Sequence, residues 1–126
     1  MNGATYDSGA LIAADRDDRR LWALHRRLLE RGHTPTVPAG VLGQCWRGGP
    51  QPRLRQLLAG CRVEDLTEPL ARAAGALLGT TGRVDVIDAS VVVGTLVRGD
   101  GVFSSDRVDL EALAAGTPRR LNIVDV

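Results

Sequence analysis

Short apolar runs alternate with longer amphipathic stretches along the chain. Residues 19–31 carry apolar side chains at helical spacing and stop at Gly32, so they predict an amphipathic helix. The apolar positions of this stretch are Leu21, Trp22, Leu24, Leu28 and Leu29. Residues 3–6 form a β-prone run that leads directly into Asp7, and residues 10–14 after it are helix-prone. This pattern places Asp7 at a junction between a strand and a helix.

The rest of the chain continues the alternation. We predict strands at 36–37, 61–66, 101–103 and 121–126, and helices at 39–47, 54–59, 68–78, 84–97 and from Asp106 through 115. Residues 79–82 predict a flexible joint because two glycines fall there. Segment 84–97 is ambiguous, since its valines favour a strand and its length favours a helix. We interpret it as a buried helix.

Strands that alternate with helices predict a definite fold class. Right-handed crossovers between such elements give a mostly parallel central sheet with helices on both faces, a three-layer α/β/α arrangement. The length of 126 residues and the 44% hydrophobic content suit one compact core. We therefore expect a single α/β domain over residues 1–126.

Four acidic residues are the main candidates for chemistry. Asp7 and Asp106 follow predicted strands, and the carboxyl ends of parallel strands are where open sheets bind ligands. Asp85 and Asp88 are three residues apart on an otherwise apolar segment. Four carboxylates in one place repel each other unless a cation compensates, and Mg²⁺ and Mn²⁺ prefer oxygen ligands. A bound ion of this kind can activate water to hydrolyse a phosphodiester.

Each acid also has a simpler explanation. Asp7 and Asp106 suit helix N-caps, Asp85 suits the first turn of a helix, and Asp109 suits a solvated surface. Acids at two strand ends, together with two on one apolar helix, favour the metal site over four separate explanations.

Composition limits the other function classes. The formal charge of +1 argues against a protein that coats nucleic acid, and 3% aromatic residues leave no platform for stacking bases. All sixteen basic residues are Arg, which we attribute to genome base composition. A receiver-like phosphoacceptor domain needs a lysine, and the chain has none.

Histidine and cysteine offer weaker candidates. We interpret His25 and His33 as surface residues and Cys45 and Cys61 as reduced core thiols, because no tetrahedral zinc spacing is present. Trp22 is expected in the core or against a partner. No basic leader or run of eighteen apolar residues occurs, so we expect a cytoplasmic protein without a membrane segment.

Three sequence motifs resemble those of the PIN-domain family, especially its VapC-like toxins. They are TYDSGALIA at 5–13, GRVDVIDASVV at 82–92 and VFSSDRVDL at 102–110. The resemblance implies metal ligands at Asp7, Asp85 and Asp106, the residues expected to carry catalysis. It adds Asp88 as a further ligand, and Ser104 and Asp109 as supporting residues.

The resemblance also implies activity and partners. It predicts a PIN-like fold and a Mg²⁺- or Mn²⁺-dependent endoribonuclease that acts on RNA, forms a homodimer and is inhibited by a small antitoxin protein in its active-site groove.

One departure from the family pattern concerns Gln44. It stands where the family usually has a metal-binding Glu, so the site loses one charge and we expect weaker metal affinity. An amide oxygen can still support the ion. Arg47, one turn further along, suits either a phosphate contact or the surface. The alternative function is a PIN-like module that binds RNA or protein without cutting.

Overall fold

A computed structural model of the protein describes residues 3–126. Five strands form one sheet in the order β3-β2-β1-β4-β5, and every neighbouring pair is parallel. The strands are β1 (Ala4–Tyr6), β2 (Thr36–Pro38), β3 (Arg62–Glu64), β4 (Gly101–Ser104) and β5 (Asn122–Asp125). The predicted α/β class and mostly parallel sheet are confirmed.

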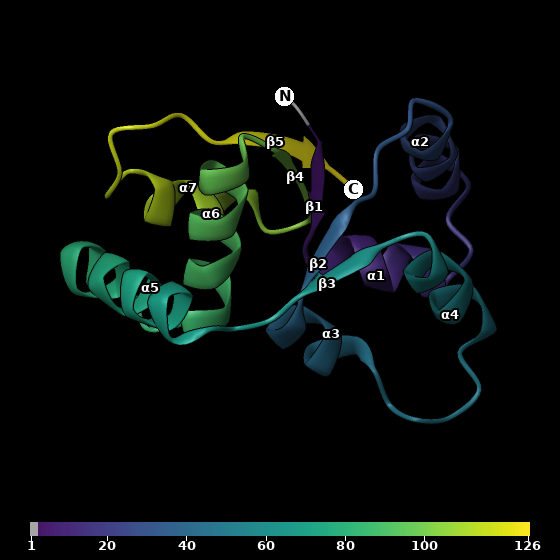
Figure 1. The fold of residues 1–126 in the computed structure, drawn as a ribbon, viewed down its shortest axis with the longest axis horizontal. Coiled ribbons are helices and arrows are strands. Elements are labelled where there is room, and N and C mark those ends of the chain that lie inside the picture. The colour runs from purple at the N-terminus through teal and green to yellow at the C-terminus, as the bar shows by residue number, and fades with distance from the viewer. Residues whose placement is uncertain (1–2) are drawn as a thin grey trace.

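Within residues 3–126, seven helices connect and cover the strands. They are α1 (Ser8–Asp15), α2 (Arg19–Glu30), α3 (Ala39–Cys45), α4 (Pro52–Ala59), α5 (Glu68–Thr81), α6 (Val86–Arg98) and α7 (Arg107–Ala114). Helices α5, α6 and α7 pack together on one side of the sheet, and α1 packs with α2, α3 and α4 on the other (Figure 1). The two groups of helices give the three layers that the sequence predicts.

The strand order creates a crevice at the centre of the sheet. From β1 the chain proceeds outward through β2 to β3, then returns through α5 and α6 to β4 on the other side of β1. Open parallel sheets bind ligands at such a reversal, beyond the carboxyl ends of the strands, and we call this place the crevice. The strands beside the crevice end at Tyr6 and Ser104.

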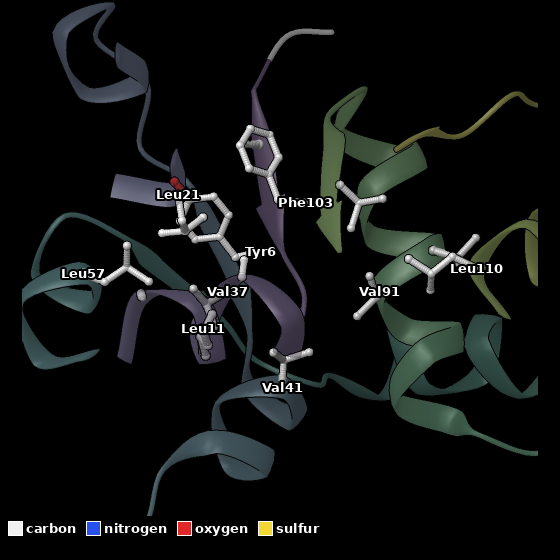
Figure 2. Close-up of a cluster of buried hydrophobic side chains, with 14 of the residues drawn as sticks. Tyr6, Leu11, Leu21, Val37, Val41, Leu57, Val91, Phe103 and Leu110 are labelled. Carbon is white, nitrogen blue, oxygen red and sulfur yellow. The ribbon is translucent and has the colours of Figure 1, made fainter. Parts of the chain in front are cut away.

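Aliphatic side chains fill both faces of the sheet. Figure 2 shows Tyr6, Leu11, Leu21, Val37 and Leu57 on the α1 side, and Val91 and Leu110 on the α6 and α7 side. All of these are almost fully buried. Burial of a Val or Leu side chain contributes about 1.5–3 kcal/mol relative to exposure. This set supplies a core to a chain with few aromatic residues.

Arg98 fixes α6 to the sheet through a polar network. Its guanidinium donates to Thr5 Oγ1 at 2.7 Å, to Asp100 Oδ2 at 2.9 Å and to Glu64 Oε2. Thr5 also donates to Asp100 at 3.0 Å. The charged side chains are largely buried, and burial is tolerated because each charge has a partner of opposite sign. The helix that carries two candidate acids is thereby anchored at its far end.

Two predictions about α5 and α6 need correction. The flexible joint at 79–82 is wrong, because α5 continues to Thr81 and only Gly82 leaves the helix, with φ of 71°. A glycine inside a helix costs about 1 kcal/mol, which packing of α5 against α6 offsets. Helix α6 begins at Val86, so Asp85 precedes the helix.

The thiols and tryptophans lie where the core meets the surface. Cys45 and Cys61 are free and partly buried, and burial raises the pKa of the Cys61 thiol to about 12. Trp22 packs on the core and donates to Ala14 O at 3.2 Å. Trp46 packs partly on the core, with the Arg55 guanidinium 4.7 Å from its ring centroid.

In the part of the chain that the structure describes, no helix is long and apolar enough to cross a membrane.

His25 is buried, so the prediction of a surface histidine is wrong at this position. It falls between Leu21 and Leu28 on the buried face of α2 and is 3% exposed. Its Nδ1 lies 2.7 Å from the Tyr6 hydroxyl, which satisfies both polar groups. Burial lowers the pKa of His25. His33 is partly exposed.

The buried imidazole predicts a loss of stability in mild acid. Because the folded-state pKa of His25 is lowered below its unfolded value of 6.5, the unfolded state binds more protons as the pH falls past 6.5. Thermal melts at pH 7.5 and 5.5 should therefore show a smaller drop in Tm for His25→Gln than for the wild type. His33→Gln serves as the control. An equal drop in all three proteins would contradict the role assigned to His25.

Candidate active site

Asp7 lies at the carboxyl end of β1 and is 1% exposed. Its Oδ1 accepts a hydrogen bond from Ser8 N–H at 2.8 Å, so the residue caps α1 as the simpler explanation supposed. Burial raises the pKa of Asp7; hydrogen bonds from Ser8 and Ser104 oppose the rise, and the charges of Asp106 and Asp85 add to it. Capping of α1 requires only Asp7, so it does not explain why the charges of other acids act on this residue.

Ser104 joins the two central strands at this point. It is the fully buried last residue of β4, and its Oγ donates to Asp7 Oδ2 at 2.9 Å. The same Oγ accepts the Asp106 N–H at 2.9 Å. A single hydroxyl therefore fixes the Asp7 carboxylate and the backbone that carries Asp106. The supporting position predicted for Ser104 has a structural basis in these two bonds.

Asp106 stands at the N-cap position of α7 but does not cap it. Its side chain makes no capping hydrogen bond, and it is exposed. The capping explanation for Asp106 is therefore wrong. Its carboxylate makes no hydrogen bond within residues 3–126, and its charge acts on Asp7.

Asp85 is the N-cap of α6. Its Oδ1 accepts the N–H groups of Ile87 and Asp88 at 2.9 and 3.0 Å. Both helix-capping acids, Asp7 and Asp85, hold one oxygen on their own helix. Asp85 Oδ2 makes no hydrogen bond within residues 3–126. One oxygen of Asp85 thus stays available for a ligand.

The pKa of Asp88 depends on the charges of the other acids. Burial and then the charges of Asp85, Asp7, Asp106 and Asp109, in that order, raise the pKa of Asp88 to about 7. Carboxylates from β1, α6, the β4–α7 turn and α7 therefore act on one side chain. Such a cluster is stabilised by protonation or by a cation.

The donor set fits a hard divalent cation by its chemistry. The side chains concerned offer carboxylate oxygens, which Mg²⁺ and Mn²⁺ prefer. Over residues 3–126, however, no three His, Cys, Asp or Glu side chains approach one point closely enough to hold an ion. The acids repel one another across the crevice, and two of them bend back to cap helices. To coordinate an ion, the carboxylate oxygens of these acids would have to turn toward a common centre.

Gly9 permits the close approach of α1 to the β4–α7 turn, a role that the sequence gave no sign of. A Cβ at Gly9 would lie 2.4 Å from Ser105 Oγ and 2.7 Å from Ser105 N. Real Cβ atoms do not approach atoms this closely, so a larger side chain would push the turn away. The absence of a Cβ at Gly9 lets the residue after Asp7 and Ser8 pack against Ser105, which precedes Asp106.

Asp109 forms an ion pair with Arg83 at the edge of the acid cluster. Its Oδ1 lies 2.5 Å from Arg83 Nη2. Arg83, Asp85, Asp88 and Asp109 line one depression of about 280 Å³. The predicted solvated position of Asp109 is therefore only partly right, because the side chain is half-exposed and ion-paired.

Gln44 and Arg47 lie beside a different depression. Gln44 is exposed and lines a hollow of about 310 Å³ with Asp15 and Arg47, among others. The Arg47 guanidinium donates to the carbonyls of Gly43, Gln44 and Trp46, so it closes the end of α3. The supporting role of Gln44 stays a prediction. The sequence allows two roles for Arg47, a phosphate contact and a place on the surface. The contacts with backbone carbonyls favour the surface role.

Comparison with known proteins shows a shared fold. No protein-family model and no curated protein sequence matches the chain. Among solved structures, a toxin-antitoxin complex from Klebsiella pneumoniae contains a chain with a TM-score of 0.66 and 16% identity, matching 97% of this chain and 96% of that one. VapBC2 from Rickettsia felis, bound to a promoter DNA fragment, gives a TM-score of 0.69 at 11% identity over 98% of each chain. FitAB bound to the IR36 DNA fragment gives 0.66 at 14% identity over 97% and 94%.

These likenesses establish architecture over nearly the whole chain. At identities of 11–16% they show the fold alone. The fold is PIN-like, as the sequence motifs predicted. The roles of individual side chains rest on the geometry above.

The raised pKa of Asp88 predicts a pH-dependent cost to stability in metal-free protein. The folded-state pKa of about 7 lies above the ordinary 3.8, so the folded protein loses stability relative to the unfolded chain as the pH rises from about 4 through 7. In EDTA, Asp88→Asn should therefore gain Tm over the wild type more at pH 8 than at pH 5. The exposed Asp65→Asn is the matched control. A gain that does not change with pH would show that the acids do not converge on Asp88.

Proposed function

From its PIN-like fold and its acidic crevice, we propose that the protein is a divalent-metal-dependent endoribonuclease and the toxin of a toxin–antitoxin pair. The observation that carries the proposal is the joining of Asp7 and Asp106, at the ends of two adjacent parallel strands, through the Ser104 hydroxyl. The raised pKa of Asp88, due to burial and then to the charges of Asp85, Asp7, Asp106 and Asp109, agrees with it. Folds of this class bind their ligands at the switch point of the parallel sheet, and the acid cluster belongs to this place.

The chain's own residues divide the work. Asp7, Asp85 and Asp106 would hold Mg²⁺ or Mn²⁺ through carboxylate oxygens, and Asp88 would add a fourth carboxylate. Both oxygens of Asp7 already accept a hydrogen bond, so Asp7 would bind the ion through a remaining lone pair. When bound, such an ion lowers the pKa of water and neutralises charge on the phosphate. Ser104 orients Asp7 through its hydroxyl, and Gly9 keeps the two strand ends together.

The same cluster explains why phosphodiester hydrolysis is favoured over other reactions. Four or five carboxylates repel an anionic substrate and a bound cation reduces that repulsion, so metal would strengthen RNA binding. No protein nucleophile is needed, because water attacks the phosphorus.

The solved structures of similar fold support the proposed protein partner. One of them is a toxin-antitoxin complex from Klebsiella pneumoniae, and another is VapBC2 from Rickettsia felis. We propose that a small antitoxin covers the crevice of this chain, and that two copies of the chain form a homodimer in the cytoplasm. Sedimentation of the purified protein tests the dimer, and a stable monomer would count against it.

Gln44 supports a second candidate function. Its exposed side chain lies beside another hollow, and no three acids approach a common point in the described part of the chain. A site lacking one carboxylate would bind RNA or a protein and fail to cut. The next two experiments separate this module from the nuclease.

Metal-dependent cleavage is the direct test of the proposed activity. Purified protein in Mn²⁺ should cut total RNA into discrete fragments, and EDTA should abolish the cutting. Asp7→Asn should reduce the rate by at least about 100-fold, because it removes a charge that would contact the ion. Asp65→Asn, an exposed loop acid, should cut like the wild type. RNA binding without cutting in any divalent metal would favour the binding module.

Gln44→Glu tests whether this position faces the ion. A charge added about 4 Å from the ion in water contributes about 1 kcal/mol, and up to about 4 kcal/mol in a less polar setting. Mn²⁺ affinity measured by calorimetry should therefore rise about fivefold or more. Gln56→Glu, on the exposed surface of α4, is the matched control. Equal affinities for all three proteins would remove Gln44 from the site.

A further inference from the structure

Arg83 occupies a fixed place at the rim of the acid cluster. It directly follows Gly82, which ends α5 in the left-handed conformation, and its N–H donates to Thr81 Oγ1 at 3.4 Å. Two residues later Asp85 caps α6. The end of one helix and the start of the next therefore hold the Arg83 backbone in place. Its side chain lines the same depression as Asp85 and Asp88.

The Arg83–Asp109 ion pair is poorly suited to a structural role. Arg83 Nη2 and Asp109 Oδ1 are 2.5 Å apart, but the two side chains are 41% and 46% exposed. Exposed ion pairs of this kind contribute little to stability. Asp109 therefore directs the guanidinium over the depression more than it holds α5 to α7.

Arg83 is the cation of an otherwise acidic depression. In the structure of residues 3–126, it is the only Arg that lines this hollow, beside Asp85, Asp88 and Asp109. Its Nη2 contacts Asp109, and its Nε and Nη1 have no hydrogen-bond partner in the described chain. A guanidinium offers five N–H donors in a planar fork that matches phosphate oxygens. Arg83 thus has donors available beside the acids that would bind the ion.

Arg98 and Arg107 lack this freedom. Arg98 is almost buried and contacts Glu64 and Asp100. Arg107 binds the carboxylates of Asp125 and Glu111 and also the Ile123 carbonyl. The donors of these two residues are committed to the fold, whereas Arg83 keeps free donors beside the acid cluster.

We propose that Arg83 binds a backbone phosphate of single-stranded RNA next to the acid cluster, with Asp109 as the positioning residue that directs its guanidinium. The inference rests on the proposed nuclease function, since it takes RNA as the ligand of this site. A phosphate contact carries no sequence information, so Arg83 sets affinity and register of the strand and leaves sequence preference to other groups. This assignment gives Asp109 a role other than metal ligation.

The test measures binding of a fluorescent single-stranded RNA by anisotropy in EDTA, at several salt concentrations. Without metal the proposed cleavage does not occur, so binding is read separately. Arg83→Gln should weaken binding about 10-fold, the expected loss of a charge-assisted hydrogen bond, and lower the slope of log K against log salt by about 0.7. Arg83→Lys should retain the slope, because it keeps the charge. Arg72→Gln, which breaks an exposed pair with Glu68 on α5, should change neither quantity.

The outcomes separate the two claims. Equal affinity and salt slope for Arg83→Gln and Arg72→Gln, or no RNA binding by the wild type, would overturn the assignment of Arg83. A loss for Arg83→Gln that differs between two RNAs of unrelated sequence would also overturn it, because a phosphate contact weakens all sequences alike. Failure to cut RNA in Mn²⁺, with the Arg83 effect on binding intact, would sink the nuclease and leave the phosphate contact standing.

Discussion

The Ser104 hydroxyl donates to the Asp7 carboxylate, and this bond links the ends of the two central strands. Ser104 also accepts the Asp106 N–H, so one buried oxygen sets the distance between acids that are 99 residues apart in sequence. The bond exists because β1 and β4 are parallel neighbours whose registers pair Tyr6 with Phe103. The close contact of Gly9 with Ser105 reinforces the same junction. The crevice and its chemistry depend on this single joint.

The remaining acids reach the joint from α6. The buried contacts of Arg98 hold one end of this helix, and Asp85 caps the other end beside the crevice. Asp88 follows within the first turn of α6, where a helix N-terminus favours negative charge. The dipole lowers the cost of one acid there, but burial and then the charges of the other carboxylates still raise the pKa of Asp88. That residual cost is the physical reason for expecting a cation at the site.

Periodicity in the sequence was enough to predict the elements and the parallel sheet. The apolar face of α2 and the acids that follow β1 and β4 are local patterns, and the structure places them as expected. Such local patterns could not predict contacts between residues far apart in the sequence. The partner of His25 is Tyr6, 19 residues earlier, and nothing local distinguishes this histidine from a surface one. The pairing of Arg83 with Asp109 likewise depends on how α5 meets α7.

The central claim is that the acids around Asp7 share one divalent ion. Crystals grown with Mn²⁺ and measured at a wavelength where manganese scatters anomalously would locate it directly. The account predicts one anomalous peak within about 2.3 Å of oxygens from Asp7, Asp85 and Asp106, in the crevice beyond β1 and β4. A fully occupied peak elsewhere, or no peak in the crevice at millimolar Mn²⁺, would contradict the account.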